Sequence, residues 1–509
     1  MKPHDGRPRP GRPLAVLDDV TEVRLFAVAR GCRAGLPLEA HEVPAQPLEV
    51  RDAGGCLGGV PLDDGGDVAR SGRYDLAIVG SGAAGFSAAI AGTRRNRRVV
   101  MVERGVLGGT GVKVGCIPSK SLLAAAEARH VAARASFPGI ATTGGPVDMP
   151  SLPEGEDEVV SDLRRERYED LARDYGWDLV RDEAVFSEGP VLTVGGRPLE
   201  AAHYYLVATG SRPWVPRGRG CQLHRAGVRA ALARPGINVV LPEALEGIAP
   251  FEEPEISEAL ASVLEDGRLK ATRANVMRVQ ASDGLRLVTA RLAAGELEFA
   301  AEHVLVATAR RPAIDRLDPG RVGVEVGLRG EVAVDEHLRT ADPRVWAAGE
   351  SRARPSSPNV ADAQGDVVVA NAFDDAERTI DYRALPRVTF TCPNAASVGL
   401  TDAQAREQGI DCECRVVSLE YVPRAIVNRD TRGLVKMVAE RTSGRILGVH
   451  ILAPNAGEVI PGRRVRGAGG MTVEDVAGMW CPYLTISETV KLAAQSFTTN
   501  VRKLSCCAA

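Results

Sequence analysis

The sequence predicts a multidomain α/β fold, and three observations indicate it. From position 73 onward, short β-branched runs such as YDLAIVG and RRVVMVER alternate with alanine-rich stretches such as AGFSAAIAGTRR, the pattern of a strand–helix–strand unit. Further buried strands are expected at HYYLVATG, INVVL, EHVLVATA and RVWAAGE. From LPRVTFT onward, strands mix with a closing helix, ISETVKLAAQSF, which indicates a C-terminal α+β domain.

Length and composition narrow the class of protein. A chain of 509 residues is expected to form two to four domains. Its 63 basic and 66 acidic residues are interspersed and give a net charge of -3, so no basic surface for nucleic acid is expected. The most apolar window, Leu76 to Gly92, is interrupted by glycine and serine, so we expect no membrane span.

Cysteine usage and the N-terminus indicate a compartment. Ten cysteines are too few for the disulfide framework of a secreted protein, and MKPHDGRPRP lacks the apolar core of a signal peptide. We therefore expect that the protein acts in a reducing cytoplasm. Residues 1–72 are rich in Gly, Pro, Arg and Asp, so they are expected to form a poorly ordered extension, which an upstream start codon would explain.

A glycine-rich motif follows the first strand of the α/β region. Gly80, Gly82 and Gly85 form a GxGxxG pattern between strand and helix, and Glu103 lies at the end of the next strand, about 20 residues further on. The glycines let the backbone approach a pyrophosphate at the helix N-terminus, while the acid can accept a ribose hydroxyl. A glycine-rich turn without a ligand is the alternative, and the motif does not identify the dinucleotide.

The segment GGTGVKVGCIPSK, residues 108–120, resembles the active-site helix of the flavin-dependent disulfide reductases, whose pattern is GGTCxNxGCxPSK. The turn Ala208-Thr209-Gly210, a second turn at Ala307-Thr308, and VWAAGE in the place of an AGD turn support the resemblance. It covers residues 73–509 with two local breaks.

The resemblance implies two Rossmann-like nucleotide-binding domains and a C-terminal α+β dimerisation domain. FAD would bind the parts at 73–213 and 311–382, NADPH would bind a truncated domain at 214–310, and residues 383–509 would form a homodimer with shared active sites. The cofactor contacts that it implies are Gly80, Gly82, Gly85, Glu103, Gly105, Thr110, Lys120, Ala184, Thr209, Gly210, Gly349, Glu350 and Pro358.

The C-terminal part resembles the mercuric reductases within this family. Tyr483 precedes Glu488 where disulfide-acting members carry a catalytic His, and the chain ends in the vicinal pair Cys506-Cys507. Mercury(II) is soft, prefers thiolate ligands and moves between thiolates by exchange, without a proton relay. Two alternatives for the tail are a prenylation box and incidental surface thiols. The prenylation box is disfavoured because the aliphatic residues that it requires after the cysteine are missing.

The expected function is therefore NADPH-dependent, FAD-mediated reduction of mercury(II) to elemental mercury for detoxification. Cys116 would be the flavin-proximal thiolate, Cys506 and Cys507 would deliver the metal to the partner subunit, and Tyr483 with Glu488 would line the site. A lipoamide-dehydrogenase-like disulfide reductase and a catalytically impaired flavoprotein that binds mercury stay open as alternatives.

Three departures from the family pattern are the largest. Gly111 replaces the first redox cysteine, and between Gly210 and Ala307 the sole candidate for the NADPH glycine loop, residues 218–223, follows no strand. Segment 461–470, PGRRVRGAGG, replaces an apolar helix start. Since the last two breaks are rich in Arg, Gly, Ala and Pro, we interpret them as local frameshifts, which resequencing or peptide mapping tests.

Cys412 and Cys414 form a CxC motif in an expected strand, where positions i and i+2 share a face. A metal site and a structural role are both open, and the structural role is favoured because no further His or Cys is nearby. Cys392 and Cys481 are expected to be core or near-surface thiols, with Cys481 a candidate for the metal route because it lies close to Tyr483.

Overall fold

The computed structural model describes fourteen stretches of the chain: residues 25–29, 74–113, 115–134, 136–148, 151–189, 191–199, 202–214, 238–245, 247–266, 269–282, 284–306, 310–352, 357–460 and 470–504. Cys506, Cys507 and the segments 218–223, 307–309 and 461–469 lie outside these residues.

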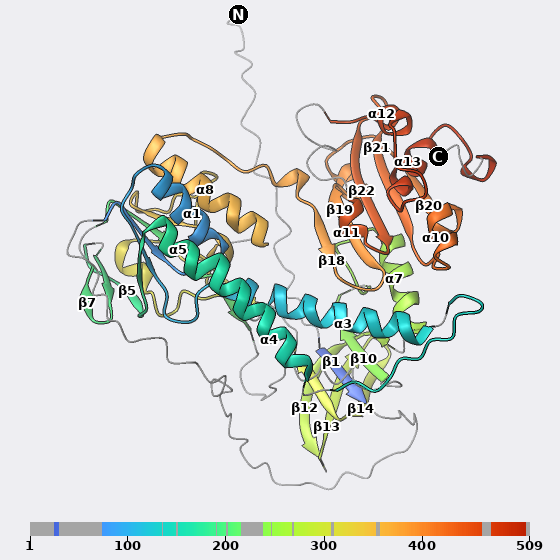
Figure 1. Ribbon diagram of the computed structural model, residues 1–509, viewed down its shortest axis with the longest axis horizontal. Helices are drawn as coiled ribbons and strands as arrows, with labels where there is room; N and C mark the ends of the chain where they lie inside the picture. Colours follow the sequence, from blue (N-terminus) through green and yellow to red (C-terminus); the bar gives the residue numbers. More distant parts are fainter. Residues whose placement is uncertain are drawn as a thin grey trace, which may run out of the picture.

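A five-stranded parallel sheet forms the first α/β unit (Figure 1). Its strands, in spatial order, are β17 (Val345–Ala347), β8 (Tyr204–Val207), β2 (Leu76–Val79), β3 (Val99–Val102) and β4 (Asp178–Val180). Leu76 and Ile78 join one core cluster, while Ala77 and Val79 join another. The sheet is therefore buried on both faces, as expected for continuous apolar strands.

Two helices cover one face of this sheet in close contact with each other: α1 (Ala83–Arg94) and α8 (Pro358–Asp374). A Cβ at Gly365 would lie 2.3 Å from the backbone oxygen of Ala84, so glycine is required where the helices meet. This packing brings a late segment of the chain against the glycine-rich motif.

A second sheet, in the order β11–β10–β1–β15, forms the core of the region predicted to bind NADPH. Strands β10 (Asn238–Glu243) and β11 (Leu269–Arg273) are parallel and are joined through α7 (Pro254–Asp266), while β15 spans His303–Val306. The strands expected at INVVL and EHVLVATA are confirmed as β10 and β15.

Strand β1 (Leu25–Ala29) lies between β10 and β15 and is antiparallel to both. Segment 25–29 of the predicted extension thus forms a strand, while the extension at 1–72 stays a prediction. The backbone of β1 occupies the sheet position next to β10. A three-stranded antiparallel sheet follows, made of β12 (Asn275–Ser282), β13 (Leu285–Leu292) and β14 (Gly295–Ala301).

The C-terminal domain is built on a five-stranded antiparallel sheet with β20 at one edge. In spatial order its strands are β18 (Arg387–Thr389), β19 (Asn394–Gly399), β22 (Ile446–Ala453), β21 (Leu434–Glu440) and β20 (Cys412–Ser418). Every residue of β22 is buried. The associated helices are α9 (Asp402–Glu407), α10 (Pro423–Val427), α11 (Ala456–Val459), α12 (Val473–Gly478) and α13 (Glu488–Gln495).

Helix α3 (Cys116–Arg134) runs from the first α/β unit towards the C-terminal domain (Figure 1). The ammonium of Lys120 lies 4.2 Å from the centre of the Phe390 ring, and Arg134 forms a 3.3 Å ion pair with Asp430. Both ends of α3 thus contact the C-terminal domain. No helix among the described residues is long and apolar enough to cross a membrane.

The remaining elements connect or flank these sheets and helices. They are α2 (Gly109–Lys113), α4 (Ser151–Arg164), α5 (Asp170–Tyr175), β5 (Ala184–Ser187), β6 (Val191–Val194), β7 (Arg197–Pro198), β9 (Ser211–Pro213), β16 (Arg310–Pro312), a π-helical turn (Arg165–Glu169) and 3₁₀ turns at Pro319–Val322, Gly349–Ser351, Tyr382–Ala384, Leu419–Tyr421 and Val501–Lys503. The predicted α/β class is confirmed, whereas the domain limits at 72, 213, 310 and 382 stay predictions.

Candidate redox site

The dinucleotide loop, residues 80–85, joins β2 to α1. Gly80 has φ +106°, and a Cβ there would lie 2.4 Å from the oxygen of Ala208; a Cβ at Gly85 would lie 2.2 Å from the oxygen of Gly80. Both positions therefore admit only glycine. A Cβ at Gly82 would meet nothing within 4 Å, so this side of the loop is open to a ligand.

Glu103, at the end of β3, closes this loop. Its carboxylate accepts hydrogen bonds from the amide of Ser81 at 3.0 Å, from the hydroxyl of Ser81 at 2.6 Å and from the amide of Gly105 at 2.7 Å. Ser81 is fully buried. The sequence assigned Glu103 to a ribose hydroxyl, and in this structure the carboxylate faces the loop itself; its ribose contact stays a prediction.

A cavity of about 60 Å³ opens beside the loop. Gly80, Glu103, Ala184 and Thr209 line it, so four of the predicted cofactor contacts lie together. The hydroxyl oxygen of Thr209 is buried and has no hydrogen-bond partner within the described part of the chain. An open glycine cradle and an unsatisfied buried hydroxyl are the features that a bound dinucleotide completes, so the residues fit FAD.

The predicted turn at Gly349 and Glu350 also lies against this loop. Gly349 has φ +71°, its amide donates to Oε1 of Gln364 at 2.7 Å, and a Cβ there would lie 3.5 Å from the Cβ of Ala84. The carboxylate of Glu350 accepts a hydrogen bond from Ser211 and lies 3.4 Å from Arg310. Glu350 is thus engaged by β9 and β16, and its predicted contact with a flavin chain is untested.

Two other predicted contacts have structural roles at chain turns. Gly210 has φ +68°, and its carbonyl accepts from the amide of Ala313 at 2.9 Å. Pro358 is the first residue of α8, whose N-terminus is capped by Ser357.

The redox segment, residues 108–120, is held directly on the dinucleotide loop. The amide of Gly108 donates to the hydroxyl of Ser81 at 3.2 Å, and a Cβ at Gly109 would lie 2.7 Å from the Cα of Gly82. The carbonyl of Thr110 accepts from the amide of Gly115 at 2.8 Å, which closes the turn before Cys116. Cys116 begins α3 as a free, half-buried thiol.

Gly111 lies one turn before this thiol. A Cβ there would meet nothing within 4 Å, and its φ is not positive. The backbone therefore accepts a side chain at the position where the family carries its first redox cysteine. Glycine at 111 is not required by packing.

Tyr168 is a site residue that sequence reasoning missed. It lies in the π-helical turn, its ring packs edge-on against Phe86 at 4.7 Å between centroids, and it lies 3.5 Å from a Cβ built on Gly108. Burial, with the negative charges of Asp362 and Cys116, raises the pKa of its hydroxyl. Nothing in the sequence indicated that a tyrosine lies beside Cys116, because Tyr168 belongs to a helical turn about 50 positions downstream that contains no recognisable motif.

Comparisons with known proteins agree with this geometry. The family model described as pyridine nucleotide-disulphide oxidoreductase matches residues 74–231 and 220–365, and its dimerisation-domain model matches residues 385–494. The mercuric reductase of Streptomyces lividans is 48% identical over 468 residues, covering 86% of this chain and 98% of the relative. The chain belongs to the mercuric reductase family. The mercuric reductase of Staphylococcus aureus is 38% identical, covering 88% of this chain and 87% of the relative.

Solved structures support the same fold. The flavoprotein disulfide reductase RclA from Escherichia coli, as a Cu(II) complex, matches with a TM-score of 0.73 at 24% identity, over 84% of this chain and 100% of RclA. LpdA from Mycobacterium tuberculosis matches with a TM-score of 0.74 at 20% identity, over 84% of this chain and 100% of LpdA. At these identities the likeness concerns the fold alone.

In this member of the mercuric reductase family, Tyr483 and Glu488 lie in the C-terminal domain. Tyr483 is 55% exposed. Glu488 is fully buried at the start of α13, where Oε2 accepts from the amide of Thr485 at 3.0 Å and Oε1 has no partner among the described residues. The structure places Cys116 and Tyr483 on different domains, and it brings Lys120 to Phe390.

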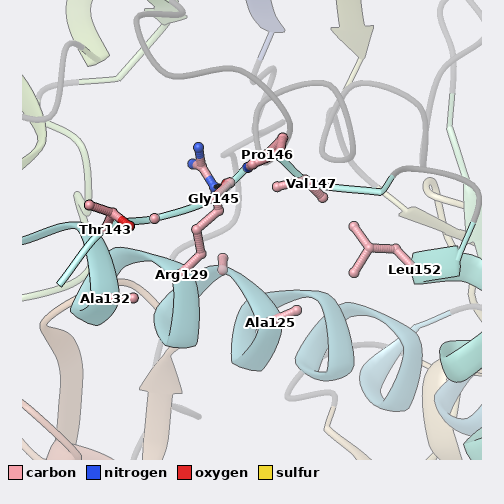
Figure 2. Close-up of a pocket in the computed structure, with 10 residues that line it drawn as sticks. Ala125, Arg129, Ala132, Thr143, Gly145, Pro146, Val147 and Leu152 are labelled. Atoms are coloured by element: carbon pink, nitrogen blue, oxygen red, sulfur yellow. Dashed lines mark hydrogen bonds between the residues drawn. The ribbon is translucent and has the colours of Figure 1, made fainter.

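A larger cavity of about 300 Å³ lies away from this chemistry, between α3 and the segment 143–147 (Figure 2). Figure 2 shows α3 as its floor, with Arg129 reaching across to the segment, where it donates to the oxygen of Gly145 at 3.3 Å. Half of its lining residues are alanine or glycine and none carries a thiol, so the cavity does not belong to the redox site.

Proposed function

We propose that this protein is a mercury(II) reductase that uses NADPH and FAD to convert mercury(II) into elemental mercury. One observation carries the proposal: the free thiol of Cys116 begins a helix whose preceding loop is bonded to the dinucleotide loop through Gly108 and Ser81. This arrangement brings a soft metal ligand next to a cofactor cradle, in a chain of the mercuric reductase family.

The reaction balances with two electrons. FAD, when bound, supplies the relay between the hydride of NADPH and the metal. For each mercury(II) reduced to the neutral atom, one NADPH is oxidised and one proton is released. Mercury(II) binds thiolates because it is a soft cation. The neutral mercury atom carries no charge and is not held by the thiolates, so it leaves the site.

The described residues suggest how this chain would bind its two cofactors. Gly80, Gly82 and Thr209 would hold FAD, with Glu103 and Ser81 keeping the loop in shape. The described residues around β10, α7 and β11 form half of a nucleotide-binding unit, but none of the described loops offers a pyrophosphate cradle for NADPH. No NADPH contact is therefore assigned to a named residue.

Mercury(II) would travel by thiolate exchange from Cys506 and Cys507 to Cys116. Because Tyr483 is exposed and lies on another domain, we place it against Cys116 of a partner subunit in a homodimer, consistent with the dimerisation domain at 385–494. The protein would act in the cytoplasm, where the described thiols stay free.

Gly111 favours a second candidate, a flavoprotein that binds mercury(II) but reduces it slowly. With one thiol in place of two, the metal has fewer fixed ligands near the flavin, and orientation is poorer. The experiment that separates the two candidates measures volatile mercury from purified, FAD-loaded protein given NADPH and mercury(II). Release that requires both reagents supports the reductase; retention of bound mercury with no release supports the second candidate.

A further inference from the structure

A cluster of three potential metal ligands lies in the C-terminal domain, outside the redox site. Cys412 and Cys414 lie on the edge strand β20, at positions i and i+2 that share a face. Asp402 begins α9, whose start is fixed by a capping box between Thr401 and Gln404. The turn after α9 returns the chain to β20, so the carboxylate faces both thiols.

The ligand atoms are close together. The Sγ of Cys412 lies 3.1 Å from Oδ1 of Asp402, and one ligand atom from each of the three residues lies within 4.8 Å of the others. Metal–sulfur bonds of about 2.3 Å place two thiolates about 3.8 Å apart in a tetrahedral site and about 4.6 Å apart in a linear one. Separations of no more than 4.8 Å between the ligand atoms are compatible with either geometry.

We propose that Asp402, Cys412 and Cys414 form a binding site for a thiophilic divalent cation such as mercury(II) or zinc(II), separate from the redox site. Two cysteine sulfurs select soft or borderline cations, and a carboxylate is a common third ligand of zinc. Three protein ligands leave a position for water or for an incoming thiol, so the ion can be exchanged.

Burial and charge suit an ion at this position. Cys412 is only 3% exposed, whereas Cys414 and Asp402 are half-buried, so the cluster is reached from their side. Burial, followed by the charge of Asp402, raises the pKa of Cys414 to about 12, and burial also raises that of Cys412.

A nearby cation offsets the charge that remains. Two thiolates and one carboxylate around a divalent ion carry one net negative charge. Arg406 donates to Oδ1 of Asp402 at 2.8 Å, and the ammonium of Lys436 acts on Cys414. Lys436 is itself paired at 2.9 Å with Glu253 and with Glu255, so Arg406 is the cation that offsets the charge of a loaded site.

The site adjoins the contact between α7 and the C-terminal sheet. The amide of Asp402 donates to Oε1 of Glu253 at 2.7 Å, and Glu253 is itself paired with Lys436. An ion that ties α9 to β20 therefore stabilises the side of the sheet against which the nucleotide domain packs. This adds a readout, the melting temperature, that is independent of turnover.

The test counts bound metal in full-length, FAD-loaded protein from which the tail thiols have been removed by Cys506→Ser and Cys507→Ser. This background is compared with the same protein carrying Cys412→Ser and Cys414→Ser, and with a control carrying Cys392→Ser, a thiol outside the cluster. Each is loaded with mercury(II) or, separately, zinc(II), desalted against a monothiol, and weighed by native mass spectrometry.

We expect the background and the Cys392→Ser control to retain one ion more per chain than the double variant, with a higher melting temperature after loading. Asp402→Asn should weaken zinc retention at least about tenfold and mercury retention less, because a carboxylate matters more to zinc.

The variant Cys414→Ala, at a half-buried position, repeats the test if the double variant fails to fold. Equal ion counts in the background and a folded cluster variant would overturn the proposal. Mercury-dependent turnover is not used, so the result is independent of the proposed function.

Discussion

The carboxylate of Glu103 accepts two hydrogen bonds from Ser81, one at 3.0 Å from the amide and one at 2.6 Å from the hydroxyl. The same hydroxyl accepts a bond from the amide of Gly108 at 3.2 Å. One buried serine thus joins the end of β3, the dinucleotide loop and the loop that carries the redox segment. The cofactor cradle and Cys116 are held together by this contact.

Ser81→Ala should therefore reduce flavin retention. It removes the acceptor of the buried Gly108 amide, which should cost about 1–3 kcal/mol, while the half-buried carboxylate of Glu103 keeps its bonds from the amides of Ser81 and Gly105. The measurement is the ratio of flavin to protein absorbance after gel filtration, together with urea unfolding. Ser119→Ala is the matched control, since among the described residues that hydroxyl bonds to the carbonyls of Gly115 and Cys116 in its own turn. Equal flavin content in the two variants would contradict the assignment.

Gly111→Cys should restore the family's thiol pair. The position has free space and an ordinary φ, so the new side chain fits without strain. We expect mercury-dependent NADPH oxidation to rise by about tenfold or more, because a second fixed ligand orients the metal. Gly111→Ser controls for size without a thiol. Rates that rise equally in both variants would show that packing, not the thiol, is responsible.

The ion pair between Lys436 and Glu253 should be costly to break from one side. Nζ and Oε2 lie 2.9 Å apart, with the two side chains 5% and 1% exposed. Lys436→Met leaves a buried carboxylate without its cation, which should lower the free energy of unfolding by about 3–5 kcal/mol. Arg291→Met, at an exposed pair with Glu296, should cost less than about 1 kcal/mol. Denaturant melts of both variants check this, and equal losses would refute it.

Acid should weaken the contact between α3 and the C-terminal domain. The pKa of Asp430 lies below its ordinary 3.8, chiefly because Arg432 donates a hydrogen bond to its carboxylate. Burial opposes this shift, and the positive charges of Arg432 and Arg134 add to it. Its folded pKa is depressed, so its stabilisation is present above pH 3.8 and is lost as the pH falls through the folded value. Asp430→Asn should therefore flatten the acid limb of stability against pH. An unchanged limb in urea melts between pH 5 and 3 would contradict this.

The sequence was sufficient for elements whose signal is local. The strand–loop–helix at 75–94 follows from a β-branched run, three glycines and an alanine-rich stretch in succession. The cluster of Gly80, Glu103, Ala184 and Thr209 follows from the family resemblance. Features that depend on distant segments were not predicted. Leu25–Ala29 pair as an antiparallel strand with β10, far along the chain, and composition alone gave no partner for them.

The third ligand of the CxC cluster was missed for a similar reason. Asp402 is separated from Cys412 by a helix and a turn, and no spacing rule joins a capped helix start to a strand. Tyr168 reaches the redox segment from an irregular helical turn, whose position the sequence does not indicate.

The proposed function requires that mercury(II) be reduced at Cys116. Its most direct test is mercury-dependent NADPH oxidation by the FAD-loaded chain, measured beside Cys116→Ser in excess monothiol. We expect slow oxidation that requires mercury(II) and that falls to background in Cys116→Ser, while both proteins keep their flavin. Oxidation that does not require mercury(II), or that Cys116→Ser leaves unchanged, would contradict the claim.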